Sequence, residues 1–224
     1  MRIYYSKTDC IRDEADVFKA LPHLTKYRVE KLSRIKQEKN RQQSVAVGLL
    51  LAYALREYGL LASDLQIDTN QDGKPCLSEF PDLHYNLSHT DDYVAVVISD
   101  TEVGIDIERV REGKERLAKR FFSEEEYQML QNEWSDEAFT RIWTRKESVI
   151  KAYGVGMRMP LSAFSTVENQ VCFDDIVRNT MLEIEDDYFV QSYRINDEYW
   201  LSVCSTEEKL GVQPLEVNIR DLIE

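Results

Sequence analysis

Two spacings of apolar residues follow one another along the chain, a period of two and a period near 3.6. Alternating or β-branched runs between polar breaks are typical of strands. They predict strands at 2–5, 84–87, 93–99, 103–108, 164–173, 188–195 and 199–204. The three middle strands are separated by short polar breaks, so we expect them to form an antiparallel meander. Asp72-Gly73, directly before Lys74 and Pro75, predicts a turn.

Helical spacing predicts four principal helices whose ends carry recognisable signals. Thr25 is a suitable N-cap, and Ser123 followed by Glu126 forms the sequence of a capping box. Gly59 and Gly154 stand where helices commonly stop. The expected helices begin after Thr25, near Val45, after Ser123 and after Ser135 or Asp136, and run to about Ile35, Arg56, Trp134 and Tyr153.

This order of elements predicts an α+β fold with a boundary near residues 100–110 and no flexible linker. The longest uncharged apolar run, Val45 to Leu55, has eleven residues. A membrane-spanning helix needs about 20, and the first ten residues lack the apolar core of a signal peptide. We therefore expect a cytoplasmic protein.

The balance of charge is strongly acidic but uneven. Lys and Arg number 28 against 41 Asp and Glu, a net charge of −13. This argues against a nucleic-acid or anionic-membrane partner. Residues 1–60 are nevertheless basic, and the excess is concentrated at 26–41, with Lys26, Arg28, Lys31 and Arg34 expected to face outward from their helix. The segment indicates either a site for a small anion or a solvated helix face.

The four cysteines, at 10, 76, 172 and 204, show no C-x-x-C spacing, and His23, His84 and His89 form no cluster with them. We expect reduced, mostly buried thiols and no zinc site.

Asp106 and Glu108 are two residues apart on a predicted strand, so their side chains share one face while Ile105 and Ile107 point into the core. Two carboxylates that converge at a buried strand repel each other. A divalent cation relieves the repulsion, and oxygen-only ligands favour Mg²⁺. The alternative is an edge strand with a polar face.

Glu147 and Lys151 lie one helical turn apart, and Trp143 is one turn before Glu147 on the same stripe. A carboxylate and an ammonium beside an apolar wall indicate a site. The alternative is a surface ion pair.

Ser88 and His89 follow a predicted strand, and hydroxyl, imidazole and backbone N–H groups at such a strand end can bind a phosphate. A turn held by side-chain hydrogen bonds is the alternative.

Five segments together carry a resemblance to a known family. G-K-P-C at 73–76, N-L-S-H at 86–89, G-I-D-I-E at 104–108, R-F-F-S-x-x-E at 120–126 and W-T-R-K-E-S-x-x-K at 143–151 occur in order. With them the chain resembles the 4'-phosphopantetheinyl transferases, in particular the long, surfactin-type branch, over about residues 24–165. The resemblance implies two similar α+β halves in one pseudo-two-fold symmetric, monomeric chain. We expect 1–102 to form the half that holds the 3'-phosphate of coenzyme A, and 103–224 the half with the metal and catalytic residues.

The resemblance also implies roles for single residues. Asp106, Glu108 and Glu147 would hold Mg²⁺, with Mn²⁺ as a substitute, and Lys151 would contact the pyrophosphate of coenzyme A. Arg28 and Lys31 would bind its 3'-phosphate, and Lys74, Ser88 and His89 its nucleotide. One departure is Ser44, where close relatives often carry Arg; Arg41, nearly a turn earlier, is a candidate replacement.

The implied reaction transfers phosphopantetheine from coenzyme A to a serine of an apo acyl or peptidyl carrier protein and releases 3',5'-ADP. Glu147 would take the serine proton directly or through water. The alternatives are a non-catalytic module that binds coenzyme A or the carrier, and another Mg²⁺-dependent phosphate enzyme. We expect the carrier to dock near the helices of the second half, at Phe121, Phe122 and 127–134.

Overall fold

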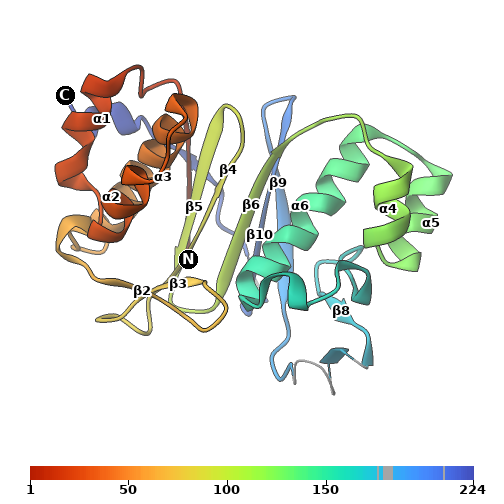
Figure 1. Cartoon of the computed structure of the whole chain (residues 1–224). Helices are drawn as coiled ribbons and strands as arrows, with labels where there is room; N and C mark the ends of the chain where they lie inside the picture. The colour runs from red at the N-terminus through yellow and green to blue at the C-terminus, as the bar shows by residue number, and fades with distance from the viewer. Residues whose placement is uncertain (176, 179–183, 209) are drawn as a thin grey trace. The chain divides into compact units, whose positions relative to one another are not determined.

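The computed structural model describes residues 1–175, 177–178, 184–208 and 210–224. The chain divides into two compact units, one made of 1–100 with 212–224 and the other of 101–211. Each unit has its own sheet and its own long helix packed on that sheet (Figure 1). The mixture of helices and strands confirms the predicted α+β class.

In the first unit the sheet has the order β11-β1-β5-β4. β1 and β4 each pair antiparallel with β5, with Arg2 opposite Ile98 and His84 opposite Ser99. β11 pairs parallel with β1, with Leu215 opposite Tyr4. A separate hairpin is formed by β2 and β3. The strands are β1 (Arg2–Lys7), β2 (Ile67–Thr69), β3 (Pro75–Leu77), β4 (His84–His89), β5 (Tyr93–Ser99) and β11 (Leu215–Glu216).

The helices of the first unit are α1 (Glu14–Ala20), α2 (Lys26–Ser33) and α3 (Glu38–Arg56). α3 packs on β5 and β1 and buries almost every residue from Val45 to Leu55. α2 lies against α3 at Gly48, where a Cβ atom would be 2.7 Å from Leu24 Cδ2 and 3.1 Å from Arg28 Cγ. The glycine therefore allows α2 to approach α3 closely.

In the second unit the sheet has the order β6-β10-β9, and all pairs are antiparallel. α6 packs on β6 and β10. A two-stranded pair, β7 with β8, follows α6. The elements are β6 (Val103–Arg109), α4 (Glu115–Phe121), α5 (Glu124–Asn132), α6 (Asp136–Tyr153), β7 (Phe164–Ser165), β8 (Cys172–Phe173), β9 (Phe189–Ile195) and β10 (Tyr199–Ser205).

The two units repeat one topology. In each, a first strand leads into helices, the last of which packs on the sheet, and a hairpin then returns with its second strand in contact with the first. This gives β1-β5-β4 in one unit and β6-β10-β9 in the other. The similarity agrees with the two alike halves that the family resemblance implied.

Most helix ends follow the predicted local signals. Thr25 Oγ1 accepts a hydrogen bond from the Arg28 N–H, and Ser123 and Glu126 form the complete capping box. Ser135 rather than Asp136 caps α6, and Gly154 ends it with a φ of 80°. This left-handed conformation is one that glycine adopts at little cost.

Three elements differ from the sequence-based expectations. The strand at 103–109 does not continue a meander with β4 and β5. It pairs with β10 in the second unit, whereas β4 and β5 belong to the first. The segment 164–173 is not one strand but two short strands that pair with each other. The long helix of the first unit begins at Glu38, well before Val45.

The division of the chain also differs from the expected halves 1–102 and 103–224. Residues 212–224 belong to the first unit, because β11 extends the sheet beside β1. Val217, Ile219 and Ile223 bury their side chains in the core of that unit.

None of the helices among the described residues is long and apolar enough to cross a membrane. The four cysteines are free thiols; Cys10 and Cys204 are buried, whereas Cys76 and Cys172 are exposed, contrary to the expectation of mostly buried thiols.

Candidate functional site

One face of β6 presents the predicted pair of carboxylates to α6. A Cβ atom on Gly104 would collide with the backbone of α6 at Ser148 O and Ala152 N, so the side chains at alternate positions from Gly104 face this helix. Asp106 is buried at 4% exposure, and Glu108 is half-buried. Ile105 and Ile107, on the other face, are fully buried as predicted. The close approach of α6 thus follows from a glycine in the middle of a strand.

α6 contributes Glu147 and Lys151, both half-buried. Lys151 Nζ lies 2.7 Å from Asp106 Oδ1, so the lysine forms an ion pair with the strand carboxylate. The alternative drawn from the sequence was a surface ion pair between Glu147 and Lys151, and this contact is a different one. The ion pair instead joins α6 to β6 at the point where the carboxylates converge.

The electrostatic environment shows that the carboxylates act on one another. Burial raises the pKa of Glu108 to about 7, and the neighbouring charge of Asp106 adds to the rise. Burial and Asp106 also raise the pKa of Glu147. Arg111 and Lys151 oppose the rise at Glu108. Three carboxylates therefore share one small region of the second unit, and the charge of Asp106 disfavours the ionised forms of Glu108 and Glu147.

These carboxylates offer an oxygen-only donor set that suits a hard divalent cation. Within the described part of the chain, no three His, Cys, Asp or Glu side chains stand close enough together to hold a metal ion as they are. The raised pKa values of Glu108 and Glu147 nevertheless show a repulsion that a bound cation would relieve. By its charge and donor atoms, the set fits such an ion.

A cavity of about 230 Å³ adjoins Glu108. Leu117, Phe139 and Trp143 supply apolar lining, and Arg111 and Lys114 supply positive charge. Trp143 also stacks on Phe139, with the ring centroids 6.2 Å apart. The predicted apolar wall beside Glu147 is thus part of an aromatic cluster.

Arg111 was not recognised from the sequence. It acts on the pKa of Glu108 and lines the cavity next to that residue. A basic residue three positions after a strand carboxylate was the available signal, but a single charge in that position is common on protein surfaces. Beyond the end of β6 at Arg109 the chain continues along the cavity, and this path brings Arg111 beside Glu108.

In the first unit, Arg28 and Lys31 stand on α2 as predicted, but Arg28 does not face solvent. It is buried at 9% exposure, and its guanidinium donates to Ser44 Oγ at 3.4 Å. Burial lowers the pKa of Arg28, and burial together with the charge of Arg28 lowers the pKa of Lys31. The two cations therefore repel each other, which is the condition in which an added anion stabilises both.

Arg41 is not positioned to replace an arginine at Ser44. Its Nε and Nη2 donate to the two carboxylate oxygens of Glu14 at 3.0 and 3.1 Å, and its Nη1 donates to Leu32 O at 3.1 Å. All three guanidinium nitrogens thus already have partners, and the hypothesis that Arg41 takes over this role is not supported.

The remaining predicted residues of the first unit lie on β4 and in the turn before β3. Ser88 is buried and His89 is exposed at the end of β4. Lys74 follows Gly73, whose φ of 87° forms the predicted turn. Arg28 and Cys76 both act on the pKa of the Tyr85 hydroxyl, which burial raises. Arg28 of α2, Cys76 of β3 and Tyr85 of β4 are therefore neighbours.

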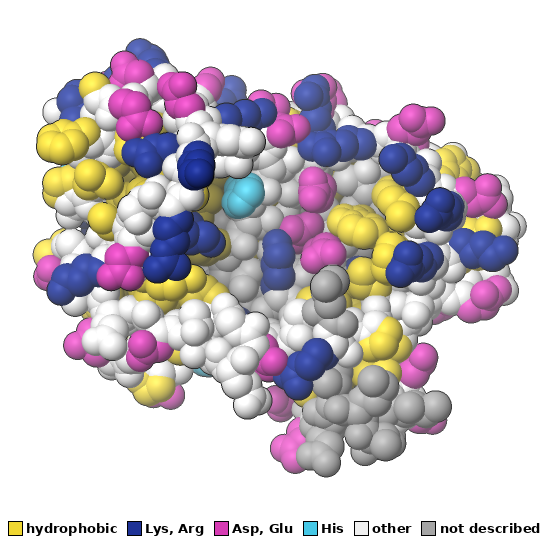
Figure 2. All heavy atoms as spheres, viewed as in Figure 1, with side chains coloured by type: hydrophobic (Ala, Val, Ile, Leu, Met, Phe, Trp, Pro, Cys, Tyr) yellow, Lys and Arg dark blue, Asp and Glu magenta, His cyan; other side chains and the backbone are white. Residues whose placement is uncertain are grey.

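Within the second unit, basic side chains gather over α4 (Figure 2). This basic group was not recognised from the sequence, because Glu112 and Glu115 offset part of its charge. Its members, all exposed, are Lys114 at the N-cap of α4 and Arg116, Lys119 and Arg120 on the helix.

Comparison with known proteins adds an independent result. Residues 13–102 match the model of the 4'-phosphopantetheinyl transferase N-terminal region, and residues 102–204 match that of the 4'-phosphopantetheinyl transferase superfamily. The chain is 29% identical to the 4'-phosphopantetheinyl transferase Sfp of Bacillus subtilis over the full length of both proteins.

Two further relatives are similar over most of the chain. A 4'-phosphopantetheinyl transferase of Bacillus subtilis is 33% identical over 70% of each chain. The 4'-phosphopantetheinyl transferase psf-1 of Bacillus pumilus is 32% identical over 75% of this chain and 72% of its own. All three relatives are named as transferases, which favours an enzyme over a non-catalytic binding module.

Proposed function

Since the chain belongs to the 4'-phosphopantetheinyl transferase superfamily and is an enzyme of the Sfp type, we propose that it uses Mg²⁺ to transfer the phosphopantetheine arm of coenzyme A. The acceptor is a serine of an apo acyl or peptidyl carrier protein, and the second product is 3',5'-ADP. The observation that carries the proposal is the convergence of Asp106, Glu108 and Glu147 with Lys151 between β6 and α6.

The carboxylates and the lysine have different roles in the reaction. Asp106, Glu108 and Glu147 would hold the divalent cation, which when bound offsets the charge of the pyrophosphate oxygens during transfer. The Lys151 ammonium contacts Asp106. It would place a positive charge next to the same phosphates.

Glu147 has a second role, as the acceptor of the serine proton. A serine hydroxyl is a weak nucleophile, and a positioned base raises its reactivity. Burial raises the pKa of the Glu147 carboxyl, which makes it a better base than an exposed carboxylate. The base role competes with the metal-ligand role, because one lone pair cannot serve both.

The first unit would bind the nucleotide of coenzyme A. Arg28 and Lys31 are assigned to the 3'-phosphate, because an anion relieves the repulsion between them. Lys74, Ser88 and His89 are assigned to the rest of the nucleotide through their ammonium, hydroxyl and imidazole groups. Ser44, hydrogen-bonded to Arg28, holds the guanidinium rather than adding a charge of its own.

We further propose that the carrier docks on the second unit near α4 and α5. Met129 and Trp134 are exposed there, and the basic residues of α4 would attract an acidic partner. Phe122, one of the residues expected to contact the carrier, is buried at 3% exposure and packs on Phe139, so it belongs to the core.

The enzyme is proposed to act as a monomer in the cytoplasm, with neither nucleic acid nor a membrane as partner. Two units of the same topology in one chain support a monomer, because one chain supplies both copies. Free thiols at the exposed Cys76 and Cys172 suit a reducing compartment. The net charge of −13 disfavours anionic polymers and surfaces.

The test is to mix the protein with an apo carrier protein, coenzyme A and Mg²⁺ and to determine the mass of the carrier. We expect a gain of one phosphopantetheine arm, and no gain when a chelator replaces Mg²⁺. A carrier of unchanged mass that remains bound to the protein would identify a binding module instead. Consumption of coenzyme A without a change in the carrier would identify another phosphate enzyme.

A further inference from the structure

Behind the carboxylate site, α6 and α5 are joined by a completely buried ion pair. Lys146 Nζ lies 2.7 Å from Glu126 Oε2, and the two side chains are 1% and 0% exposed. Lys146 directly precedes Glu147 on α6, and Glu126 is the residue that completes the capping box of α5. Neither Lys146 nor Glu126 belongs to the carboxylate set of Asp106, Glu108 and Glu147.

Both charges are fully hydrogen-bonded. Lys146 Nζ also donates to Leu161 O at 2.7 Å and to Phe164 O at 2.6 Å. Glu126 accepts from the Ser123 N–H and from both the N–H and the hydroxyl of Thr166, each at 2.8 Å. The pair therefore connects three parts of the second unit: α5, α6 and the segment 161–166.

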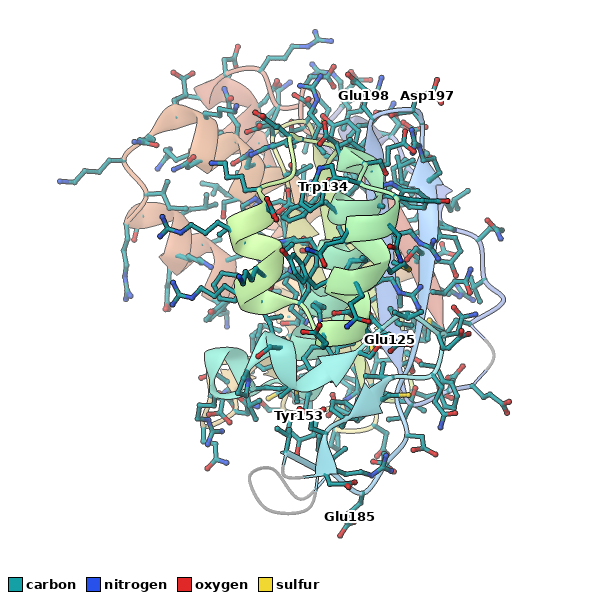
Figure 3. All side chains as sticks on the ribbon, turned by 90° about the vertical axis from the view of Figure 1, so that its right-hand side faces the viewer. Glu125, Trp134, Tyr153, Glu185, Asp197 and Glu198 are labelled. Atoms are coloured by element: carbon teal, nitrogen blue, oxygen red, sulfur yellow. The ribbon has the colours of Figure 1, made fainter. Side chains whose placement is uncertain are left out.

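A second residue of α6 is attached to the same segment. The Arg145 guanidinium donates to Thr166 O at 2.7 Å, to Glu168 O at 2.5 Å and to Ser192 Oγ at 3.4 Å. Glu125, labelled in Figure 3 at the beginning of α5, accepts from Ser165 Oγ at 2.6 Å. Residues 145 and 146 are thus both held from outside the helix, and residue 147 is the site glutamate.

Stability alone is a weak explanation for this pair. Charges that leave water lose hydration free energy that their mutual attraction does not fully restore, and apolar residues of similar volume often stabilise a fold as well or better. What a buried pair with fixed partners does provide is a defined geometry. It opposes rotation of α6 about its own axis, because any rotation would break contacts of Lys146 and Arg145.

Rotation of α6 would matter at the site. The end of a side chain lies about 5–6 Å from the helix axis, so a rotation of about 20° moves it by roughly 2 Å. Displacements of about 1 Å at a reacting group can reduce a rate about 100-fold. The close contact of Gly104 with Ser148 and Ala152 fixes the distance of α6 from β6 but leaves this rotation to other contacts.

We propose that the Glu126–Lys146 pair is a positioning device that fixes the rotation of α6 and so holds Glu147 and Lys151 toward Asp106. The pair touches neither substrate nor metal and acts through the helix. This role rests on the proposed function, because it assigns the pair to the carboxylate site of the phosphopantetheine transfer.

The test compares Lys146→Met with a control, Leu201→Ala, on the folded proteins well below their melting temperatures. Lys146→Met leaves Glu126 buried without its cation. Leu201 is fully buried in β10 opposite Ile107, so its side chain points away from α6, and its truncation lowers stability without touching the pair. We expect Lys146→Met to lower kcat at least tenfold while KM for coenzyme A changes less than threefold, and Leu201→Ala to change kcat less than twofold.

A third variant separates loss of the ion pair from the effect of an unpaired buried charge. The double change Glu126→Gln, Lys146→Met removes both charges, and the glutamine oxygen can still accept from Ser123 and Thr166. We expect kcat to stay at least tenfold below that of the wild type, because neither variant has an ion pair that links α6 to α5. We also expect the rise in melting temperature on adding Mg²⁺ to be smaller in both variants than in the wild type. This second readout does not depend on turnover.

Several results would overturn the proposal. They are a wild-type kcat in Lys146→Met, a loss of kcat no larger than that of Leu201→Ala, and a double variant whose kcat recovers to within about threefold of the wild type although the pair is gone. If Lys146→Met does not fold, the double variant decides: a kcat within about threefold of the wild type with an unchanged Mg²⁺ response contradicts positioning through the pair. Absence of transfer by the wild type would instead refute the proposed function, so the two failures are distinguishable.

Discussion

At the scale of single residues, the carboxyl of Glu108 lies in surroundings that disfavour its negative charge. Burial and Asp106 raise its pKa to about 7, well above the value of 4.5 for a free glutamate. Between these two pH values the folded protein binds more protons at this position than the unfolded chain does. The contribution of Glu108 to stability is therefore lost as pH rises from about 4.5 to 7.

This loss of stability with rising pH predicts how Glu108→Gln behaves in the absence of a divalent metal ion. The variant should melt at a temperature close to that of the wild type near pH 5 and a few degrees higher near pH 8, because glutamine carries no charge to bury. Addition of Mg²⁺ at pH 8 should raise the melting temperature of the wild type more than that of the variant. A difference in melting temperature between the two proteins that does not change with pH would show that the surroundings of Glu108 do not disfavour its charge.

Glu147→Gln keeps the shape of the side chain but removes its charge and its basicity. We expect kcat to fall about 10²–10⁴-fold, as for loss of a positioned base, with a smaller change in KM for coenzyme A. Steady-state kinetics with the carrier in excess measures both. Exposed Glu137, near the beginning of the same helix, supplies a control in Glu137→Gln, which should retain activity. Equal activities of the two variants would remove Glu147 from the mechanism.

Recognition from the sequence was most successful where a residue acts through local chemistry. Thr25, Ser123 and Gly154 end or begin helices as their types predict. The partner of Lys151 could not be found in this way. Local spacing offered Glu147, one turn away, whereas the structure pairs Lys151 with Asp106 of another element.

At the scale of elements, the distance between α6 and β6 depends on Gly104. A methyl group at this position would meet the α6 backbone at Ser148 and Ala152. Backbone atoms cannot rotate away as a side chain can, so Gly104→Ala must push the helix off the strand. Overpacking of this kind typically costs about 1–3 kcal/mol.

We therefore expect Gly104→Ala to lower both the melting temperature and kcat, the latter at least tenfold, because Glu147 and Lys151 move with the helix. Gly211→Ala is the matched control, since a Cβ atom there meets nothing within 4 Å. Its melting temperature and kcat should stay near those of the wild type. Full activity in Gly104→Ala would mean that transfer does not depend on the close approach of α6 to β6.

The basic pair on α2 permits a prediction in which the substrate, not only the protein, is changed. If Arg28 and Lys31 bind the 3'-phosphate, the double change Arg28→Ala, Lys31→Ala should raise KM for coenzyme A by about one to three decades, and less at high salt. Dephospho-coenzyme A lacks that phosphate. It should be a poorer substrate for the wild type and nearly unaffected by the double change.

Equal losses with both substrates would mean that the pair acts through the fold of the first unit. Arg28 makes this control necessary, because it is buried against Gly48 and Ser44. Its burial was not expected from the sequence. An arginine on a charged helix usually faces solvent, and only the close packing of α2 on α3 encloses it.

At the scale of the whole molecule, the α+β class and most elements followed from periodicity, whereas the pairing of strands over long distances did not. Residues 212–224 show why. Their short apolar pattern, Val217, Ile219 and Ile223, fits any nearby core, and nothing local in the sequence says that the chain returns to β1. β6 was likewise expected beside β5, because neighbours in sequence commonly pair.

The candidate site was recognised because several weak local signals occur together in one order. No single motif distinguished a metal site from a polar strand edge, and the sequence could not show that Asp106 and Glu147 face each other. The two units share one topology. The carboxylates lie on the strand–helix pair of the second unit, β6 with α6, and this is why their motifs come late in the order along the chain.

The most direct test of the central claim is the turnover of Asp106→Ala as a function of Mg²⁺ concentration, measured together with its melting temperature. Asp106 is the buried carboxylate that acts on both Glu108 and Glu147 and pairs with Lys151. Its removal should abolish transfer of phosphopantetheine at every Mg²⁺ concentration. The fold should remain nearly as stable, because the loss of the ion pair is offset by relief of the repulsion. Wild-type turnover in this variant at ordinary Mg²⁺ concentrations would contradict the assignment of the metal to these carboxylates.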